Sequence, residues 1–342
     1  MTKVVFVSPY NHGGLMSGAR KRVTNLSQSL TNRGLSEVVI CSPWDDAAGS
    51  EHVYFSLDCG FFVRIIRLVW LSLMLFKLKP DIVISESALC PVKLGRYKLY
   101  HVIHDTKFTT KYSRKNSSLT YFSHYISCRM ADRVLTVSNT EKSVICERLH
   151  MLDSKVAVSY NGLSSEWFAF PEVKIDRAYD ILYVSNFAKH KGHLALLDAL
   201  SASGNNFKVA FVGGDLGTLS EVQAKAENSS LEVDFYSALK EDELIRLYDS
   251  SKLFVFPSML EGFGMPFVEA RSRGLPVIAN KLDVFLELSN IMGGTIIDTE
   301  NGDLLRATIE SVENEVEPSK SIARFKWDNI ANEILDLDLN ER

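Results

Sequence analysis

The sequence predicts an α/β protein with two doubly wound, Rossmann-like domains, each a parallel sheet covered by helices. Short apolar runs bounded by turn residues alternate with segments of helical periodicity, which is the pattern of parallel strands buried on both faces. The chain has 342 residues, more than one hydrophobic core usually organises. The pattern is interrupted within residues 164–179, where Phe170-Pro171 and a mixed-charge stretch predict a linker.

The expected strands follow one another in two series. In the first series they are Val4–Val7, Val38–Cys41, Ile82–Ile84, Tyr100–Ile103 and Val134–Val137, and in the second Ile181–Val184, Val209–Val212, Leu253–Phe256 and Val277–Ala279. Residues 319–339 have helical periodicity after Pro318, a residue that suits a first helical turn. We therefore expect domains at residues 1–168 and 169–318, with a C-terminal helix in residues 319–342.

The net charge, the cysteines and the N-terminal segment bear on the class of partner and on the cellular compartment. A net charge of −4 gives no general attraction for nucleic acid. The five cysteines are odd in number and lack the spacing of a zinc site, so we expect free, mostly buried thiols and a reducing compartment. The N-terminus runs straight into an apolar strand without the features of a signal peptide. The protein is expected to be cytoplasmic.

One segment raises the question of a membrane. Residues 61–78 are largely apolar but are interrupted by Arg64, Arg67 and Lys77. A spanning helix needs about 20 mostly uncharged residues, whereas basic residues along an apolar helix are typical of an interfacial one. An interfacial helix and a core helix with exposed arginines both remain open.

Two loops of the first series carry candidate residues. The first strand is followed by Tyr10, His12, Gly13 and Gly14, and the next helix carries Arg20; glycines between a strand and a helix let backbone N–H groups approach a polar ligand. A flexible connecting loop is the alternative. His104 and Asp105 follow a strand, at the edge where open sheets bind ligands, although a structural histidine is equally compatible.

Basic residues follow the first strand of the second series. The segment from Asn186 to His193 contains Lys189, His190, Lys191 and Gly192 and opens a helix. An ammonium group beside a helix N-terminus suits a diphosphate. We favour an anion site here over a solvated basic turn.

The most informative stretch is residues 256–270. A buried strand ends at Pro257, a glycine-containing turn follows, and Met265-Pro266 begins a helix. Glu261 then lies on the loop, and Glu269 lies about one turn into the helix that begins at Met265-Pro266. Two carboxylates near a helix N-terminus can accept hydrogen bonds from sugar and ribose hydroxyls or balance a developing positive charge. The alternative is a loop cap and a surface carboxylate.

These elements together resemble glycosyltransferase family four, whose hallmark is two glutamates separated by seven residues with Gly-Phe-Gly between them, here Glu261 to Glu269. Residues 131–138, Ala-Asp-Arg-Val-Leu-Thr-Val-Ser, are similar to the family's Ala-Asp-x-Val-x-x-x-Ser strand. Residues 155–162 are similar to its Lys-Val-x-Val-x-x-Asn-Gly element, and residues 325–327 to its terminal Phe-x-Trp helix. The resemblance covers nearly the whole chain.

The resemblance implies a GT-B fold, with two facing domains, a deep cleft between them and a terminal helix that crosses back to the first domain. It implies metal-independent transfer of a hexose from a UDP- or GDP-sugar, with retention of anomeric configuration. We expect the acceptor to be a glycan or lipid-linked oligosaccharide of the bacterial cell surface, and a peripheral position on the inner face of the cytoplasmic membrane is compatible with this.

The resemblance also implies roles for particular residues. The implied catalytic residues are His104, Lys191 and Glu261. Donor binding falls to Gly13, Gly14, Asn186, His190, Lys191, Glu261, Gly262, Phe263, Gly264, Met265 and Glu269, with Glu269 at the ribose. Acceptor binding falls to Tyr10, His12, Arg20 and Asp105.

The chain departs from the family at the diphosphate. Members commonly place an arginine shortly before the lysine, where this chain has Asn186 and His190; Lys189 and Arg20 are candidate replacements. A nucleotide-sugar epimerase and a catalytically weak sugar-nucleotide-binding protein remain alternatives. An NAD-linked oxidoreductase is disfavoured because neither domain's first loop carries the dinucleotide fingerprint.

Overall fold

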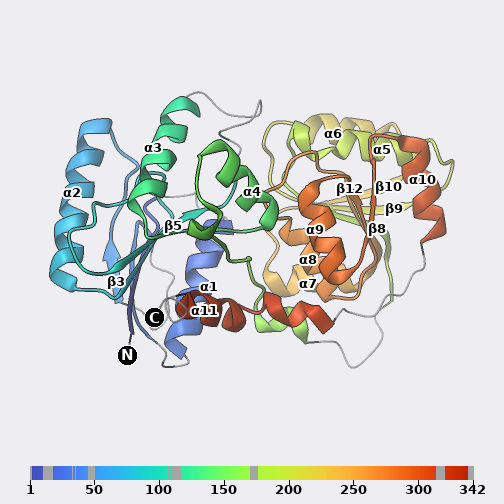
Figure 1. Ribbon diagram of the computed structural model, residues 1–342. Coiled ribbons are helices and arrows are strands. Elements are labelled where there is room, and N and C mark those ends of the chain that lie inside the picture. The colour runs from blue at the N-terminus through green and yellow to red at the C-terminus, as the bar shows by residue number, and fades with distance from the viewer. Residues whose placement is uncertain are drawn as a thin grey trace. The chain divides into compact units, whose positions relative to one another are not determined.

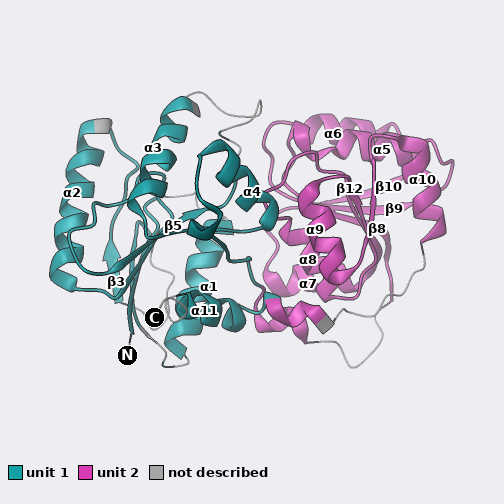
Figure 2. Cartoon of the chain, in the orientation of Figure 1, with its two compact units in different colours: residues 1–162, 325–342 teal, residues 163–324 magenta. Residues whose placement is uncertain are grey.

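The structure is a computed structural model that describes residues 2–10, 18–32, 34, 36–44, 51–106, 108, 117–169, 176–312 and 320–337. The chain forms two compact units (Figure 2): Met1–Gly162 with Phe325–Arg342, and Leu163–Arg324. Compact units and functional domains need not end at the same residue, so the domain limits at residues 168 and 318 stay predictions.

The first unit contains a seven-stranded parallel sheet with the order β3-β2-β1-β4-β5-β6-β7 (Figure 1). Its strands are β1 (Thr2–Val7), β2 (Ser36–Ser42), β3 (Glu51–Tyr54), β4 (Ile82–Ser85), β5 (Lys98–Ile103), β6 (Arg133–Thr136) and β7 (Val156–Val158). Its helices are α1 (Gly18–Asn32), α2 (Phe61–Leu78), α3 (Ser117–Met130), α4 (Asn139–Arg148) and the C-terminal α11 (Trp327–Asp336).

Strand β1 shows how this sheet is buried on both faces. Val4 and Phe6 pack with α1 and with the buried side chains of α11, whereas Val5 and Val7 pack with Leu68, Leu71 and Leu75 of α2. Successive side chains of a strand point to opposite faces, so the apolar run predicts two covered faces, as observed. The terminal helix packs against α1, which confirms the expected return to the first domain.

The second unit contains a six-stranded parallel sheet with the order β10-β9-β8-β11-β12-β13. Its strands are β8 (Tyr179–Val184), β9 (Lys208–Val212), β10 (Glu232–Tyr236), β11 (Ser251–Phe256), β12 (Val277–Asn280) and β13 (Thr295–Ile297). Its helices are α5 (His193–Ser201), α6 (Leu219–Glu227), α7 (Glu241–Asp249), α8 (Met265–Ser272), α9 (Asp283–Met292) and α10 (Gly302–Ser311). Two parallel-sheet, Rossmann-like domains are therefore confirmed.

In both units the order of the strands reverses at one point. The chain builds outward from β1 to β3 and then continues from β4 on the other side of β1. It repeats this with β8 to β10, followed by β11 beside β8. Ligands of open α/β sheets bind outside the strand ends at such a switch point. The loops after β1 and β4, and after β8 and β11, are the places to look for a site.

Two further expectations concern the first unit. All five cysteines are free, and Cys41, Cys90 and Cys128 are buried; burial raises the pKa of the Cys90 thiol to about 11. Within the described part of the chain, no helix is both long enough and apolar enough to cross a membrane.

Candidate active site

The loops after β8 and β11 are locked together by backbone contacts. The short helical turn Lys189–Lys191 ends at Gly192, whose φ is +76°, and a Cβ there would lie 2.7 Å from the carbonyl oxygen of Pro257. The amide of Met259 donates to the carbonyl of His190 over 2.9 Å. The Tyr183 hydroxyl donates to the carbonyl of Lys191 over 2.6 Å. The backbone that carries Lys191 is therefore held from both strands.

Lys191 and Glu261 meet across these loops. The Lys191 Nζ lies 2.5 Å from Glu261 Oε1, and each side chain is 13% exposed. A charged hydrogen bond that is largely shielded from water is stronger and better oriented than a surface ion pair. The sequence predicted both residues in one site, and the structure brings them into direct contact.

The turn from Gly262 to Met265 starts helix α8. Gly264 is its N-cap with φ of +90°, and a Cβ at this position would lie 2.7 Å from Cε1 of Phe285. Phe263 is buried, and Pro266 lies in the first turn of the helix. The first N–H groups of a helix have no partner within the helix and attract anions. Glycine is required here by both the backbone angle and the close packing.

Glu269 is held by a buried tyrosine. Its side chain is on α8 and the residue is only 7% exposed. The Tyr248 hydroxyl, on α7, donates to Glu269 Oε2 over 2.8 Å. Burial, together with the Glu269 charge, raises the pKa of Tyr248 well above its usual value. The tyrosine therefore stays protonated and fixes the orientation of a carboxylate that can accept hydrogen bonds from vicinal hydroxyls. The sequence analysis did not identify Tyr248.

Asn186 and His190 stand shortly before Lys191, where members of the resembled family commonly have an arginine. Asn186 is exposed, and its Oδ1 accepts from the amide of Gly214 over 3.0 Å. A Cβ at Gly213 would lie 2.0 Å from the Ser185 carbonyl oxygen, so the loops after β8 and β9 touch through backbone. Asn186 joins two loops rather than supplying a cation, and Lys189 is exposed beside it.

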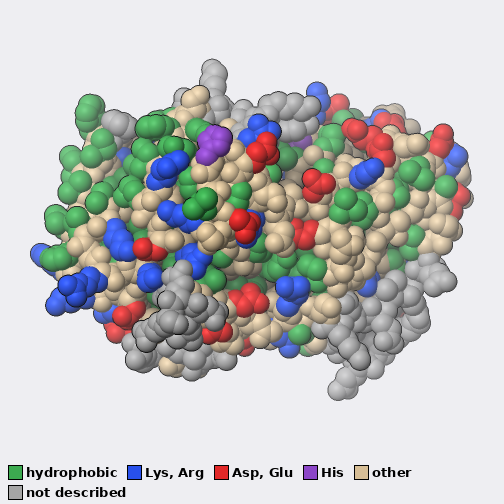
Figure 3. All heavy atoms as spheres, in the orientation of Figure 1, with side chains coloured by type: hydrophobic (Ala, Val, Ile, Leu, Met, Phe, Trp, Pro, Cys, Tyr) green, Lys and Arg blue, Asp and Glu red, His purple; other side chains and the backbone are tan. Residues whose placement is uncertain are grey.

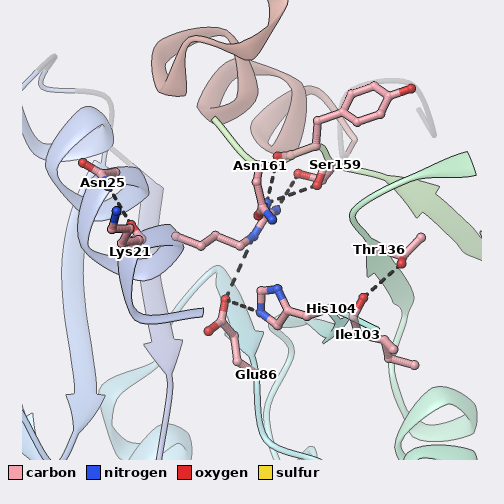
Figure 4. Close-up of polar contacts among 10 residues, drawn as sticks. Lys21, Asn25, Glu86, Ile103, His104, Thr136, Ser159 and Asn161 are labelled. Carbon is pink, nitrogen blue, oxygen red and sulfur yellow. Dashed lines mark hydrogen bonds and ion pairs between the residues drawn. The ribbon is translucent and has the colours of Figure 1, made fainter. Parts of the chain in front are cut away.

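The switch point of the first unit holds a buried carboxylate that the sequence analysis missed. Glu86 directly follows β4, and its side chain is 2% exposed. Its Oε1 lies 3.4 Å from His104 Nε2 and 4.0 Å from Arg22 Nε (Figure 4). Glu86 Oε2 has no hydrogen-bond partner among the described residues. The sequence signal is the position of Glu86 two residues after the apolar run Ile82–Ile84, and that position alone does not reveal burial.

The surroundings of Glu86 are rigid. The Arg22 guanidinium donates to Ser159 O, Tyr160 O, Asn161 Oδ1 and Ser159 Oγ. Burial lowers the pKa of Arg22 to about 10, although the Glu86 charge opposes this. On the other side, the Thr136 hydroxyl donates to the carbonyl of Ile103 over 2.9 Å and so fixes the strand end before His104 (Figure 4). His104 thus faces a fixed negative charge.

Three of the remaining predicted residues of the first unit are described by the structure. Tyr10 packs partly buried against the α2 side of the sheet, and the Arg20 guanidinium lies 4.9 Å from the centre of the Trp44 ring. Asp105 is half-buried next to His104. His12, Gly13 and Gly14 lie outside the described residues. The described residues gather no three His, Cys, Asp or Glu side chains that would hold a metal ion.

Comparison with known proteins agrees with this arrangement. Residues 16–167 match the family model "Glycosyltransferase Family 4" and residues 165–326 match "Glycosyl transferases group 1". Two parallel-sheet, Rossmann-like domains are the architecture of the GT-B fold. The chain belongs to the group 1, family 4 glycosyltransferases.

Individual relatives are distant. The chain is 27% identical to an uncharacterized glycosyltransferase of Methanocaldococcus jannaschii, over 66% of this chain and 63% of that protein. It is 26% identical to the O-antigen chain mannosyltransferase RfbU of Salmonella typhimurium, over 60% of this chain and 59% of that protein. The chain thus spans about three fifths of the length of these relatives.

Solved structures show the same fold at low identity. A glycosyltransferase from Rickettsia africae has a TM-score of 0.77 at 20% identity, covering 98% of this chain and 97% of that one. The Anabaena protein HepE, solved in complex with UDP and glucose, has a TM-score of 0.77 at 17% identity over the whole of both chains. The GT-B fold implied by the sequence is confirmed.

Proposed function

We propose that this glycosyltransferase moves a hexose from a UDP- or GDP-sugar to a hydroxyl of a glycan or lipid-linked acceptor, without a metal and with retention of configuration. The observation that carries the proposal is the contact of Lys191 with Glu261 beside the start of α8. This places a cation, a carboxylate and helix N–H groups at one switch point, together with the anchored Glu269. A nucleotide diphosphate sugar needs partners for its diphosphate, its sugar and its ribose, and these residues have the chemistry to supply them.

The proposed roles follow from the chemistry of each group. The Lys191 ammonium and the first N–H groups of α8 stabilise the negative charge that grows on the diphosphate as the bond between C1 and its oxygen breaks. Glu261 accepts hydrogen bonds from the hydroxyls of the sugar, and Glu269 accepts them from the ribose. His104 lies near the transferred sugar, with Glu86 orienting its imidazole.

The reaction needs no covalent intermediate in this proposal. The anomeric carbon passes through an oxocarbenium-like state, and the acceptor oxygen forms its bond to C1 on the face from which the diphosphate leaves. The acceptor proton passes to the departing phosphate oxygen. Positioning and fixed charges then supply most of the rate enhancement.

The comparisons support the choice of substrate class. One relative bears the name O-antigen chain mannosyltransferase, and another is a capsular polysaccharide biosynthesis glycosyltransferase of Staphylococcus aureus, 24% identical over 56% of this chain. HepE was solved with UDP-glucose. We propose bacterial cell-surface polysaccharide, such as O-antigen, lipopolysaccharide or capsule, as the product, made in the cytoplasm at the inner face of the membrane.

The purified chain, incubated with UDP- and GDP-hexoses labelled in the sugar and with lipid-linked glycans extracted from bacterial membranes, tests the proposal. We expect label in the glycan, with the anomeric configuration of the donor by NMR and with full activity in excess chelator. Epimerised nucleotide-sugar without transfer would instead identify an epimerase. Nucleotide binding without turnover of any donor and acceptor would contradict enzymatic function.

A further inference from the structure

Helix α2 has an apolar face that is exposed among the described residues of its unit. One side of the helix packs on the sheet through Leu68, Leu71 and Leu75. The other side exposes eight large apolar side chains, among them Phe62 at 79% and Ile66 at 68%. The others are Val63, Ile65, Val69, Trp70, Leu73 and Phe76. Scattered exposed hydrophobic residues are ordinary, but a contiguous row of this size marks a contact surface.

The apolar surface continues toward α3. The amide of Val92 donates to the Ser72 hydroxyl of α2, and the amide of Cys90 donates to the Ser127 hydroxyl of α3, each over 2.9 Å. Residues 90–92 therefore connect the two helices. Val92 and Leu94 on this segment, and Leu119 and Phe122 on α3, are about half exposed. Figure 3 shows hydrophobic side chains gathered over α2 and α3, with basic side chains near them. We call these residues, with the exposed face of α2, the α2–α3 surface.

Basic residues outnumber acidic ones in the segment that carries α2 and the connection toward α3. Residues 61–100 contain seven Lys and Arg against two Asp and Glu, whereas the whole chain has a net charge of −4. Neither α2 nor α3 contains an acidic residue. Of the two acids in residues 61–100, Glu86 is buried and Asp81 accepts from the backbone amide of Lys3. Every charged side chain within α2 and α3 is therefore basic, and the acids that flank this part of the chain are Asp58, exposed just before α2, and Asp132, which pairs with Lys93.

The basic side chains lie at both ends of α2. Arg64 and Arg67 donate to the carbonyls of Ser56, Leu57 and Cys59, just before the helix, so their guanidinium groups are held at its N-terminal end. Lys77 and Lys79 are exposed at its C-terminal end. The apolar row lies between these two groups. An amphipathic helix with this distribution lies in the plane of a membrane interface.

We propose that the α2–α3 surface docks the protein on a bilayer rich in anionic lipids, with α2 parallel to the membrane and its exposed apolar face among the acyl chains. The basic residues near the α2–α3 surface favour a bilayer of anionic lipids over a second copy of the chain as the partner of this surface. Two copies joined through this face would bring like charges together with no acidic residue of either helix to balance them, which is unfavourable. Anionic lipid headgroups balance the same charges. The proposal does not depend on which sugar the enzyme transfers.

Vesicle sedimentation of the full chain tests this. We expect binding to phosphatidylcholine vesicles that contain phosphatidylglycerol, weaker binding at high salt, and little binding to phosphatidylcholine alone. The triple variant Phe62→Ser, Ile66→Ser, Phe76→Ser should bind at least about tenfold more weakly, because three exposed apolar side chains no longer enter the bilayer. Lys77→Glu should weaken binding only to the anionic vesicles. Leu152→Ser with Leu216→Ser, which alters exposed leucines elsewhere, is the matched control.

Two results would overturn the docking surface. One is equal vesicle binding by the triple variant and the control. The other is a stable dimer of the natural chain that the triple variant loses, with no vesicle binding by either, since this would assign the surface to a second copy. The same variants should retain nucleotide-induced thermal stabilisation, because the donor residues lie in the other unit. Loss of docking and failure of the proposed donor site are therefore separable.

Discussion

The Lys191 ammonium and the Glu261 carboxylate form a 2.5 Å ion pair between the loops that follow the neighbouring strands β8 and β11. The pair has no net charge before a donor binds. A diphosphate brings further negative charge to Lys191, while Glu261 remains available to accept from sugar hydroxyls. In the proposed donor site, this one contact therefore links the group that meets the diphosphate to the group that meets the sugar.

Replacing Lys191 by Met should slow sugar transfer on the order of a hundredfold, because the charge that stabilises the departing diphosphate is lost. Lys189→Met removes a neighbouring exposed charge and should leave the rate within about twofold if Lys189 is solvated. Steady-state rates at saturating acceptor measure both. Equal losses in the two variants would indicate a general basic surface instead of a specific role for Lys191.

Replacing Tyr248 by Phe should weaken nucleotide binding about tenfold, since a hydrogen bond to a charged group is worth roughly 1.5 to 3 kcal/mol. The ring remains to fill its site, packed edge-on to Trp167, so the fold should persist. Calorimetric titration with the preferred nucleoside diphosphate measures the effect. Unchanged affinity would mean that the orientation of Glu269 does not depend on Tyr248.

Replacing Glu86 by Gln should reduce the rate of transfer about tenfold without altering nucleotide binding, because Glu86 acts on His104 across 3.4 Å. If the carboxylate works only through the imidazole, the loss in Glu86→Gln with His104→Ala should equal that in His104→Ala alone. Additive losses would show that Glu86 has a separate role.

His193 predicts acid sensitivity of the second unit. It packs between the rings of Tyr183 and Phe187, with centroid distances of 4.5 Å, and burial, followed by the Lys191 charge, lowers its pKa to about 3. The unfolded chain binds a proton below about pH 6.5 that the folded protein does not. The stability that the neutral, buried His193 contributes is therefore fully present above about pH 6.5, and it is lost as the pH falls toward 3.

The matched variant is His193→Phe, which keeps an aromatic ring but cannot titrate. Between about pH 7 and pH 5, the unfolding free energy of the natural protein should fall by roughly 2 kcal/mol more than that of the variant. Urea unfolding at the two pH values measures the difference. Parallel losses in both proteins would place the acid sensitivity elsewhere, for example at His124, whose pKa burial lowers to about 4.

The strands that the sequence pattern predicted are the central ones. All nine are present, whereas the four that it did not predict, β3, β7, β10 and β13, form the four edges of the two sheets. Edge strands are only partly covered, so they need not be apolar on both sides: β3 has no buried residue, and neither do β10 and β13. The continuous apolar run that marks a buried parallel strand is therefore missing from them.

The candidate residues of the second unit could be picked out from the sequence for a different reason. Lys191, Glu261 and Glu269 stand at strand ends in a glycine-containing pattern that is visible in the sequence alone. Glu86 and Tyr248 were missed because their importance depends on burial and on partners elsewhere in the chain: Glu86 lies near Arg22 and His104, and Tyr248 donates to Glu269. A single polar residue after a strand or inside a helix carries no such information.

The measurement that tests the central claim most directly is thermal unfolding of the natural protein and of Glu269→Ala across a panel of nucleoside diphosphates and nucleotide-sugars. A ligand at about 100 times its dissociation constant adds roughly 2.7 kcal/mol to the free energy of unfolding. We predict stabilisation by the ligands of one base, its loss in Glu269→Ala, and its retention in Glu227→Ala, which alters an exposed glutamate of the same unit. Stabilisation that survives in Glu269→Ala would contradict the donor site described here.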